Sequence, residues 1–339
     1  MKFEALTKAF AKKDLPDSEL ELTGEVPAEA VAPYREEALR HLAEHMELPG
    51  FRPGKVPTTM VLQQVGEVGI LEEAMDHFVR EFYPDLVEAL KLDVVGRPQI
   101  QITKLAPGNP VGLTIRTALY PEVTIPKNWK ALSEKIPAEP VEEAKDEEVD
   151  QTIESIRQSR KKDEVVPELN DEFAKSLGAF DTVDALKTQI KKGIGEEKER
   201  KAKDTRRGKI IDAILEKVIV DIPKIFVESE LDKIMSQMKE DVVRFGVKYE
   251  DYLKQIGKTE EELRNEFRDQ GRKRAKLQLT LNKIASDEKI EADKEEVEKE
   301  MVHALEHFPD ARPELVGIHI ETVMRNEKVL QMLEKTEDK

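Results

Sequence analysis

The chain has 339 residues and a formal net charge of -16 at pH 7, so its charge as a whole does not attract nucleic acid. It contains no cysteine, which excludes disulfides, thiol nucleophiles and thiolate metal sites. Aromatic residues make up 5% and charged residues 37% of the chain, a balance typical of long helices with one apolar stripe and much solvated surface.

The first part of the chain predicts an α+β domain. Residues 19–23 alternate polar and apolar side chains, as a half-buried strand does. A helix is predicted after Pro27, because apolar residues recur there at helical spacing. Two further alternating runs flank the turn residues 106–110, which indicates a β-hairpin. We therefore expect a domain over residues 1–120, with helices packed on a small antiparallel sheet.

Two more helices are predicted between the first helix and the hairpin. Thr58 is a candidate N-cap for a short helix that ends near Gly66. A longer helix follows over residues 71–86, and Pro84 should bend it.

The segment Gly50-Phe51-Arg52-Pro53-Gly54-Lys55-Val56-Pro57 connects two of these helices. Prolines and glycines let such a loop hold one shape without burying side chains. Arg52 and Lys55 would then offer donors to phosphate or carboxylate, and Phe51 an aromatic face. The residues alone favour a docking loop and an ordinary basic turn about equally. A phosphate-binding P-loop is excluded, because Val56 stands where a magnesium-binding hydroxyl is needed.

The second part of the chain predicts helices only. Prolines and acidic residues over 121–165 indicate an extended linker with one short helix. Residues 166–339 follow as an elongated all-α domain, with helices expected at 182–220, 227–245 and 316–333 and capping-box spacing at Thr259/Glu262 and Asp293/Glu296. The middle of the first of these helices, residues 196–207, has no apolar face and predicts a solvated spacer, as in a projecting arm.

Two pairs of histidines stand four residues apart, His41 with His45 and His303 with His307. Such pairs can chelate a metal, but a site needs further ligands, so surface histidines are the preferred interpretation and no metal or cofactor is expected. Neither catalytic motifs nor a catalytic residue can be assigned. Four methionines could line an adaptable binding surface, although core filling is the commoner role: Met235, Met238, Met301 and Met324.

The loop at 50–57 resembles the ribosome-docking signature of the trigger factor family of bacterial chaperones. Further resemblance lies in Leu-Tyr-Pro-Glu-Val at 119–123, in Val-Val-Pro-Glu-Leu-Asn-Asp-Glu-Phe-Ala at 165–174, in Ile222-Pro223 and in Val-Glu-Ser-Glu at 227–230. The resemblance implies a ribosome-binding domain and a helical C-terminal domain whose arms hold unfolded chains. It also implies that the family's isomerase domain, of FK506-binding type, is missing near residue 165, so we expect no enzyme activity.

This resemblance implies a cytoplasmic, ATP-independent chaperone. Its partners would be the ribosomal exit site, through ribosomal protein and rRNA, and unfolded or nascent polypeptides. No membrane partner is expected, because the chain has neither a signal-peptide region nor an apolar run that could span a bilayer. No DNA partner is expected, because the net charge of -16 does not attract nucleic acid. Two alternatives stay open. One is a ribosome-independent chaperone or assembly factor that binds folded proteins or a second copy of itself as a homodimer, and the other is an enzyme with a metal on a histidine pair.

Overall fold

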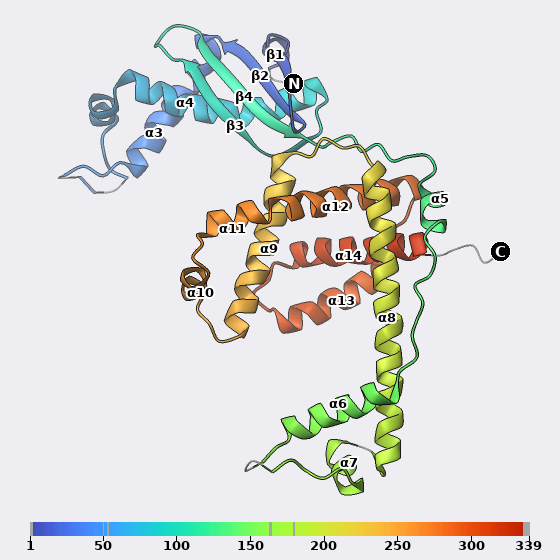
Figure 1. Ribbon diagram of the computed structural model, residues 1–339. Coiled ribbons are helices and arrows are strands. Elements are labelled where there is room, and N and C mark those ends of the chain that lie inside the picture. Colours follow the sequence, from blue (N-terminus) through green and yellow to red (C-terminus); the bar gives the residue numbers. More distant parts are fainter. Residues whose placement is uncertain (1–2, 50, 53, 163–164, 179, 335–339) are drawn as a thin grey trace. The chain divides into compact units, whose positions relative to one another are not determined.

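A computed structural model describes residues 3–49, 51–52, 54–162, 165–178 and 180–334 (Figure 1). Most of them are helical. One antiparallel sheet has the strand order β1-β2-β4-β3, with β1 (Ala11–Leu15), β2 (Glu19–Val26), β3 (Val94–Lys104) and β4 (Val111–Leu119). The helices are α1 (Glu4–Thr7), α2 (Ala28–Val31), the 3-10 turn η1 (Ala32–Tyr34), α3 (Arg35–His45), α4 (Thr58–Leu90), α5 (Trp129–Glu134), α6 (Asp146–Ser159), α7 (Asp171–Leu177), α8 (Val183–Lys217), α9 (Lys224–Arg244), α10 (Tyr249–Ile256), α11 (Glu260–Glu266), α12 (Arg268–Glu288), α13 (Lys294–His307) and α14 (Pro313–Glu334).

Contacts within the chain divide it into two compact units. The first contains Met1–Thr124 and Ile219–Gln278, and the second contains Ile125–Val218 and Leu279–Lys339. The first unit therefore combines the sheet with α9, α10 and α11, although α5 to α8 lie between them in the sequence. A backbone bridge between Thr124 and Ile219 links the two stretches of the first unit, with both amide-to-carbonyl hydrogen bonds formed.

The sheet and α4 enclose the core of the α+β region, which confirms that prediction. Leu20 and Leu22 of β2 are fully buried, as the alternating pattern predicted. The neighbouring strand β4 adds its own buried apolar side chains, and α4 packs on them with Phe78 and Phe82. These two rings stack with centroids 5.1 Å apart. The predicted hairpin is also present as β3 and β4.

Helix α4 contains the break that its sequence predicted. Gly66 has φ 69° and ψ 174°, which is not helical, so α4 consists of a short and a long helical part. Glycine suits this position because a side chain would be strained at such a φ. Thr58 is not the N-cap, however. Pro57 holds that position, and no side chain caps the helix.

Strand β1 was not predicted. Its sequence, Ala-Lys-Lys-Asp-Leu, is mostly charged and exposed, as is common for an edge strand that must avoid pairing with other chains. Asp17 and Ser18 connect it to β2 with positive φ values of 62° and 49°. Asp221 holds this turn, because the Ser18 amide donates to its carboxylate at 2.7 Å and the Ser18 hydroxyl donates to its carbonyl at 2.7 Å.

In the second unit, α8 agrees with the helix predicted over residues 182–220. Thr182 caps the helix through the amide of Ala185, at the end where the helix was expected to begin. Most of residues 196–207 are exposed, as the missing apolar face predicted, but Lys198, Ala202, Arg206 and Arg207 are partly buried. The ammonium group of Lys198 donates to Glu148 of α6 at 2.6 Å, and Arg206 donates to the carbonyl of Ile136. Long cationic side chains therefore give this stretch packing partners that an apolar periodicity does not reveal.

Among the described residues, none of the helices is long and apolar enough to cross a membrane.

Candidate docking loop and exposed apolar surface

The loop between α3 and α4 is anchored from below by one apolar side chain. Val56 is 5% exposed and packs with Ala43 of α3 and Val61 of α4. Met46, Leu48 and neighbouring residues complete this small core. The sequence prediction placed Val56 and Pro57 among the docking residues. In the structure, Val56 faces inward and positions the loop. Pro57 is exposed and is the N-cap residue of α4, which begins at Thr58.

The remaining described residues of the loop are exposed. The ring of Phe51 is 39% exposed, and Arg52 and Lys55 also lie on the surface. Gly54 has φ +75°, and the amide of Lys55 donates to the carbonyl of Arg52 at 3.0 Å, which closes a short turn. Gly50 and Pro53 lie outside the described residues. Within the described chain, neither the Arg52 nor the Lys55 side chain forms an ion pair, so both cations are available to a partner.

The four predicted methionines lie in different environments. Met235 is buried in a cluster with Tyr249 and Leu263, and Met238 packs partly against the same cluster. Met301 and Met324 are half-buried on α13 and α14 of the second unit. Met235 therefore fills a core in this conformation, whereas the other three retain some accessible surface.

Larger apolar side chains are more exposed than the methionines, and the sequence analysis did not single them out. In the first unit, Phe245 at the end of α9 is 85% exposed, and Val243 and Val247 beside it are also exposed. In the second unit, the exposed apolar residues of α13, α14 and their connection are Val302, Phe308, Leu315, Ile318 and Val323. Apolar residues exposed in groups mark surfaces that bind other molecules. A Phe directly before a helix-ending glycine, as in Phe245-Gly246, is the sequence signal that could have indicated the first group.

The predicted histidine pairs are both formed on helices. The ring centroids of His41 and His45 are 4.4 Å apart, and those of His303 and His307 are 4.7 Å apart. Within the described residues, a third nearby metal ligand is present only at His41, which lies close to Glu73 and His77 of α4.

A charged contact attaches α14 to α8 in the second unit. Both terminal nitrogens of Arg207 donate to the two carboxylate oxygens of Glu327 at 3.0 Å, and Arg207 Nε also pairs with Glu334. The hydrogen bonds from Arg207 hold the pKa of Glu327 below its ordinary value. Bidentate pairing of this kind fixes the relative orientation of the two helices as well as stabilising their contact.

We expect that Arg207→Met lowers the local stability of α14 by about 1 kcal/mol near neutral pH, the upper end for partly exposed ion pairs. The pKa of Glu327 is lower in the folded chain than in the unfolded chain. Its contribution is therefore present above the unfolded pKa of about 4.3 and is lost as the pH falls through the folded pKa. Hydrogen exchange of the α14 amides measures this difference. Lys192→Met is the control, because its pair with Glu196 is two-thirds exposed on both sides. If both variants changed the hydrogen exchange of the α14 amides equally, Arg207 would not be the residue that attaches α14 to α8.

Two family models match the chain. Residues 9–156 match the model described as bacterial trigger factor protein, and residues 182–335 match the bacterial trigger factor C-terminus. The chain belongs to the trigger factor family. Trigger factor is a chaperone, so this chain is a chaperone-type protein. The two models leave only residues 157–181 between them, and no isomerase-domain family was detected. These matches give no support to a metal-dependent enzyme.

Relatives agree with this assignment over most of their length. Trigger factor of Caldicellulosiruptor bescii is 29% identical over 82% of this chain and 83% of its own. Trigger factor of Halothermothrix orenii is 25% identical over 91% of this chain and 92% of its own. A solved trigger factor structure, described for promiscuous substrate recognition in folding and assembly, has a TM-score of 0.54 and 19% identity. It covers 96% of this chain and 98% of its own, and shows that the fold is shared.

Proposed function

We propose that this chain is an ATP-independent, cytoplasmic chaperone that docks at the ribosomal exit site through the loop 50–57 and holds unfolded nascent chains on its helical surfaces. In this proposal residues 1–120 form the ribosome-binding domain, 121–165 the linker, and 166–339 the helical domain whose arms bind clients. Family membership supports the chaperone role. The exposed side chains described above support the assignment of docking to the loop and of client binding to the apolar surfaces.

The docking proposal is based on two cationic side chains, Arg52 and Lys55, that lie beside the exposed ring of Phe51. Arg52 and Lys55 have no acidic partner within the described residues, although the chain carries a net charge of -16. A cation kept free on an acidic protein suits a partner rich in carboxylate or phosphate, as ribosomal protein and rRNA are. The effect is local, because the Debye length at physiological salt is only about 8 Å.

The holding proposal depends on exposed apolar side chains in both units. Phe245 and its neighbours in the first unit, and the group on α13 and α14 in the second, each offer weak hydrophobic contact. Several weak contacts on one chain bind an unfolded client more strongly than each contact alone. A client can leave as its own folding buries the same apolar surface. Met238, Met301 and Met324, which are partly buried, would add adaptable contacts.

A second candidate function is a ribosome-independent chaperone or assembly factor. The same exposed apolar groups favour it, because they would serve a folded partner or a second copy of this chain equally well. The two functions differ in whether the loop at 50–57 is needed.

The holding proposal is tested with the triple variant Arg244→Ala, Phe245→Ala, Lys248→Ala. We expect that roughly tenfold more of this variant is required to suppress aggregation of an unfolded client, because burying a phenylalanine is worth about 1.5–3 kcal/mol, of which a weak surface contact gains only part. Light scattering of a diluted, denatured client measures this. Ribosome co-sedimentation of the variant should not change. Unaltered suppression would contradict a role of this surface in holding.

A further inference from the structure

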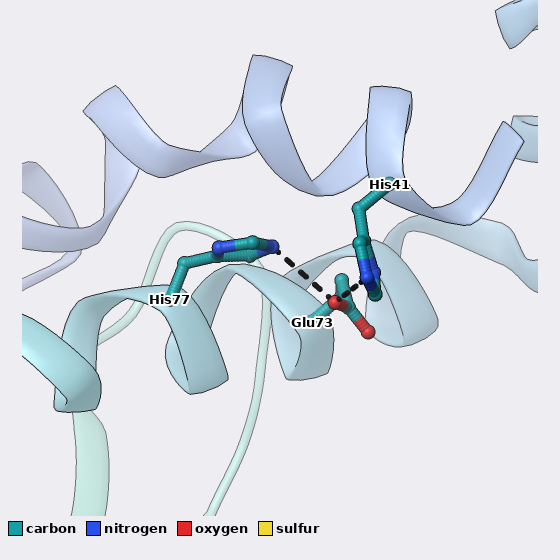
Figure 2. Close-up of side chains that lie close together, drawn as sticks. All are labelled: His41, Glu73 and His77. Carbon is teal, nitrogen blue, oxygen red and sulfur yellow. Dashed lines mark ion pairs between the residues drawn. The ribbon is translucent and has the colours of Figure 1, made fainter. Parts of the chain in front are cut away.

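Three potential metal ligands converge between α3 and α4. His41 comes from α3, while Glu73 and His77 stand one helical turn apart on α4 (Figure 2). The distance between His41 Nδ1 and Glu73 Oε1 is 2.7 Å, and that between His77 Nε2 and the same Glu73 oxygen is 3.3 Å. One carboxylate oxygen therefore lies between two imidazole nitrogens that come from different helices.

One nitrogen atom of this cluster, His77 Nε2, is buried and has no hydrogen-bond partner among the described residues. The side chains of His77 and Glu73 are only 12% and 18% exposed. His77 Nε2 is buried without a well-formed hydrogen bond, since its 3.3 Å approach to Glu73 does not have the required geometry. Its other nitrogen lies 3.5 Å from the Glu37 carboxylate. Buried polar atoms without a partner are rare and call for an explanation, of which an ion is one.

We propose that His41 Nδ1, His77 Nε2 and a carboxylate oxygen of Glu73 bind one divalent cation of the zinc class. Imidazole nitrogens suit zinc, nickel and cobalt, whereas magnesium and calcium require oxygen ligands throughout. Two histidines and one glutamate form a known three-ligand set for zinc, with water in the fourth position. His41 is 41% exposed, so the ion and its water can enter from the solvent side.

Two of the three distances between ligand atoms are close to those that a metal needs, and all three lie within 4.8 Å. Zinc bonds of about 2.0–2.1 Å to nitrogen and oxygen place tetrahedral ligands roughly 3.4 Å from one another. The 3.3 Å between His77 Nε2 and Glu73 Oε1 already agrees with this. The 2.7 Å between His41 Nδ1 and Glu73 Oε1 would lengthen by a fraction of an ångström as the ion replaces the proton on His41. Side-chain rotation on two packed helices provides such a change.

The ion would join α3 to α4 on the same helical pair that presents the loop 50–57. Another bridge between these helices, Arg35 to Glu67 at 2.8 Å, is more exposed and therefore weaker. A metal that binds only the folded arrangement stabilises it, and the stabilisation rises with the logarithm of the free metal concentration above the dissociation constant. Its role here is structural. The inference does not depend on the proposed function, because it concerns only the packing of the two helices.

Calorimetric titration of the untagged full chain with zinc chloride tests the site. The background carries His303→Ala and His307→Ala, which removes the second histidine pair. One equivalent of zinc should bind, while magnesium should not. Glu73→Gln and His77→Ala should each weaken zinc binding by more than the roughly 10- to 100-fold typical of losing an outer-shell partner. His45→Ala is the matched control and should bind as the background does, because His45 Nδ1 is engaged with the carbonyl of His41 at 2.9 Å.

Two further measurements use only the background protein, so they do not depend on the folding of the Glu73 and His77 variants. Cobalt bound to the background protein should show the visible absorption of a low-coordinate site, and zinc should slow hydrogen exchange in α3 and α4. Absence of stoichiometric zinc binding would overturn the proposal. So would a loss of binding in His45→Ala together with retention in His77→Ala, since the ion would then occupy the pair on α3 alone.

Discussion

Replacing Phe51, Arg52 and Lys55 together with alanine is expected to abolish co-sedimentation with ribosomes at near-physiological salt. The three side chains are exposed on a loop whose base is fixed by Val56, so their removal takes away contacts without disturbing the core. Interface residues of these types contribute about 1–2 kcal/mol or more each, so the triple change should weaken binding by roughly 100-fold or more. Sedimentation through a sucrose cushion over a series of salt concentrations measures it.

The matched control is the triple variant at Arg244, Phe245 and Lys248, which removes the same three residue types from an exposed site at the end of α9. This control should sediment with ribosomes as the unchanged chain does. Equal binding by the loop variant and the unchanged chain would show that another surface docks. Equal loss in both variants would indicate that general charge, and not the loop, determines binding.

Phe82→Ala should destabilise the α+β region by about 3–5 kcal/mol, a large part of the stability of a typical domain. The Phe82 ring is fully buried and stacks on Phe78 at 5.1 Å. The ring centroids of Phe10 and Phe3 lie 5.2 and 5.6 Å from that of Phe82. Alanine would therefore leave a cavity lined by aromatic rings, which cannot easily move to fill it. Urea unfolding followed by hydrogen exchange in β2 and β4 measures the loss.

Val68→Ala provides the comparison for this effect, since Val68 lies on the same helix but is half-exposed. Its cost should remain within about 0.5 kcal/mol. If Phe82→Ala cost no more than Val68→Ala, the aromatic cluster would not be the core that holds α4 on the sheet.

The elements with a regular apolar period could be predicted from the sequence. The alternation over residues 19–23 and the turn at 106–110 indicated β2 and the hairpin of β3 and β4, and Gly66 marked the break in α4. Thr259 with Glu262 indicated a capping box, which the structure contains. In each case the side chains that determine the local structure are close together in the sequence.

Elements that depend on distant partners could not be predicted in this way. Strand β1 is charged and becomes a strand only because β2 pairs with it. Residues 196–207 lack an apolar stripe, and their partners in α6, α14 and the 136 region are far away in the sequence. The grouping of Ile219–Gln278 with the sheet depends on contacts such as the bridge from Thr124 to Ile219, which no local pattern reveals.

The candidate sites show the same limit. The exposed cations of the loop were evident from the sequence, but the inward position of Val56 was not, because the residues Ala43 and Val61 that enclose it lie on two helices. The sequence did not distinguish Met235 from the other three predicted methionines, because its burial depends on packing against Tyr249 and Leu263. His77 has no histidine partner at helical spacing, so a search for such pairs could not connect it with His41.

The central claim is that docking and holding use separate surfaces of one chain, and the most direct test measures both activities on both triple variants. The variant at Phe51, Arg52 and Lys55 should lose ribosome binding and suppress aggregation as the unchanged chain does. The variant at Arg244, Phe245 and Lys248 should bind ribosomes and suppress aggregation poorly. Loss of both activities in either folded variant, or the reverse pattern, would contradict the account.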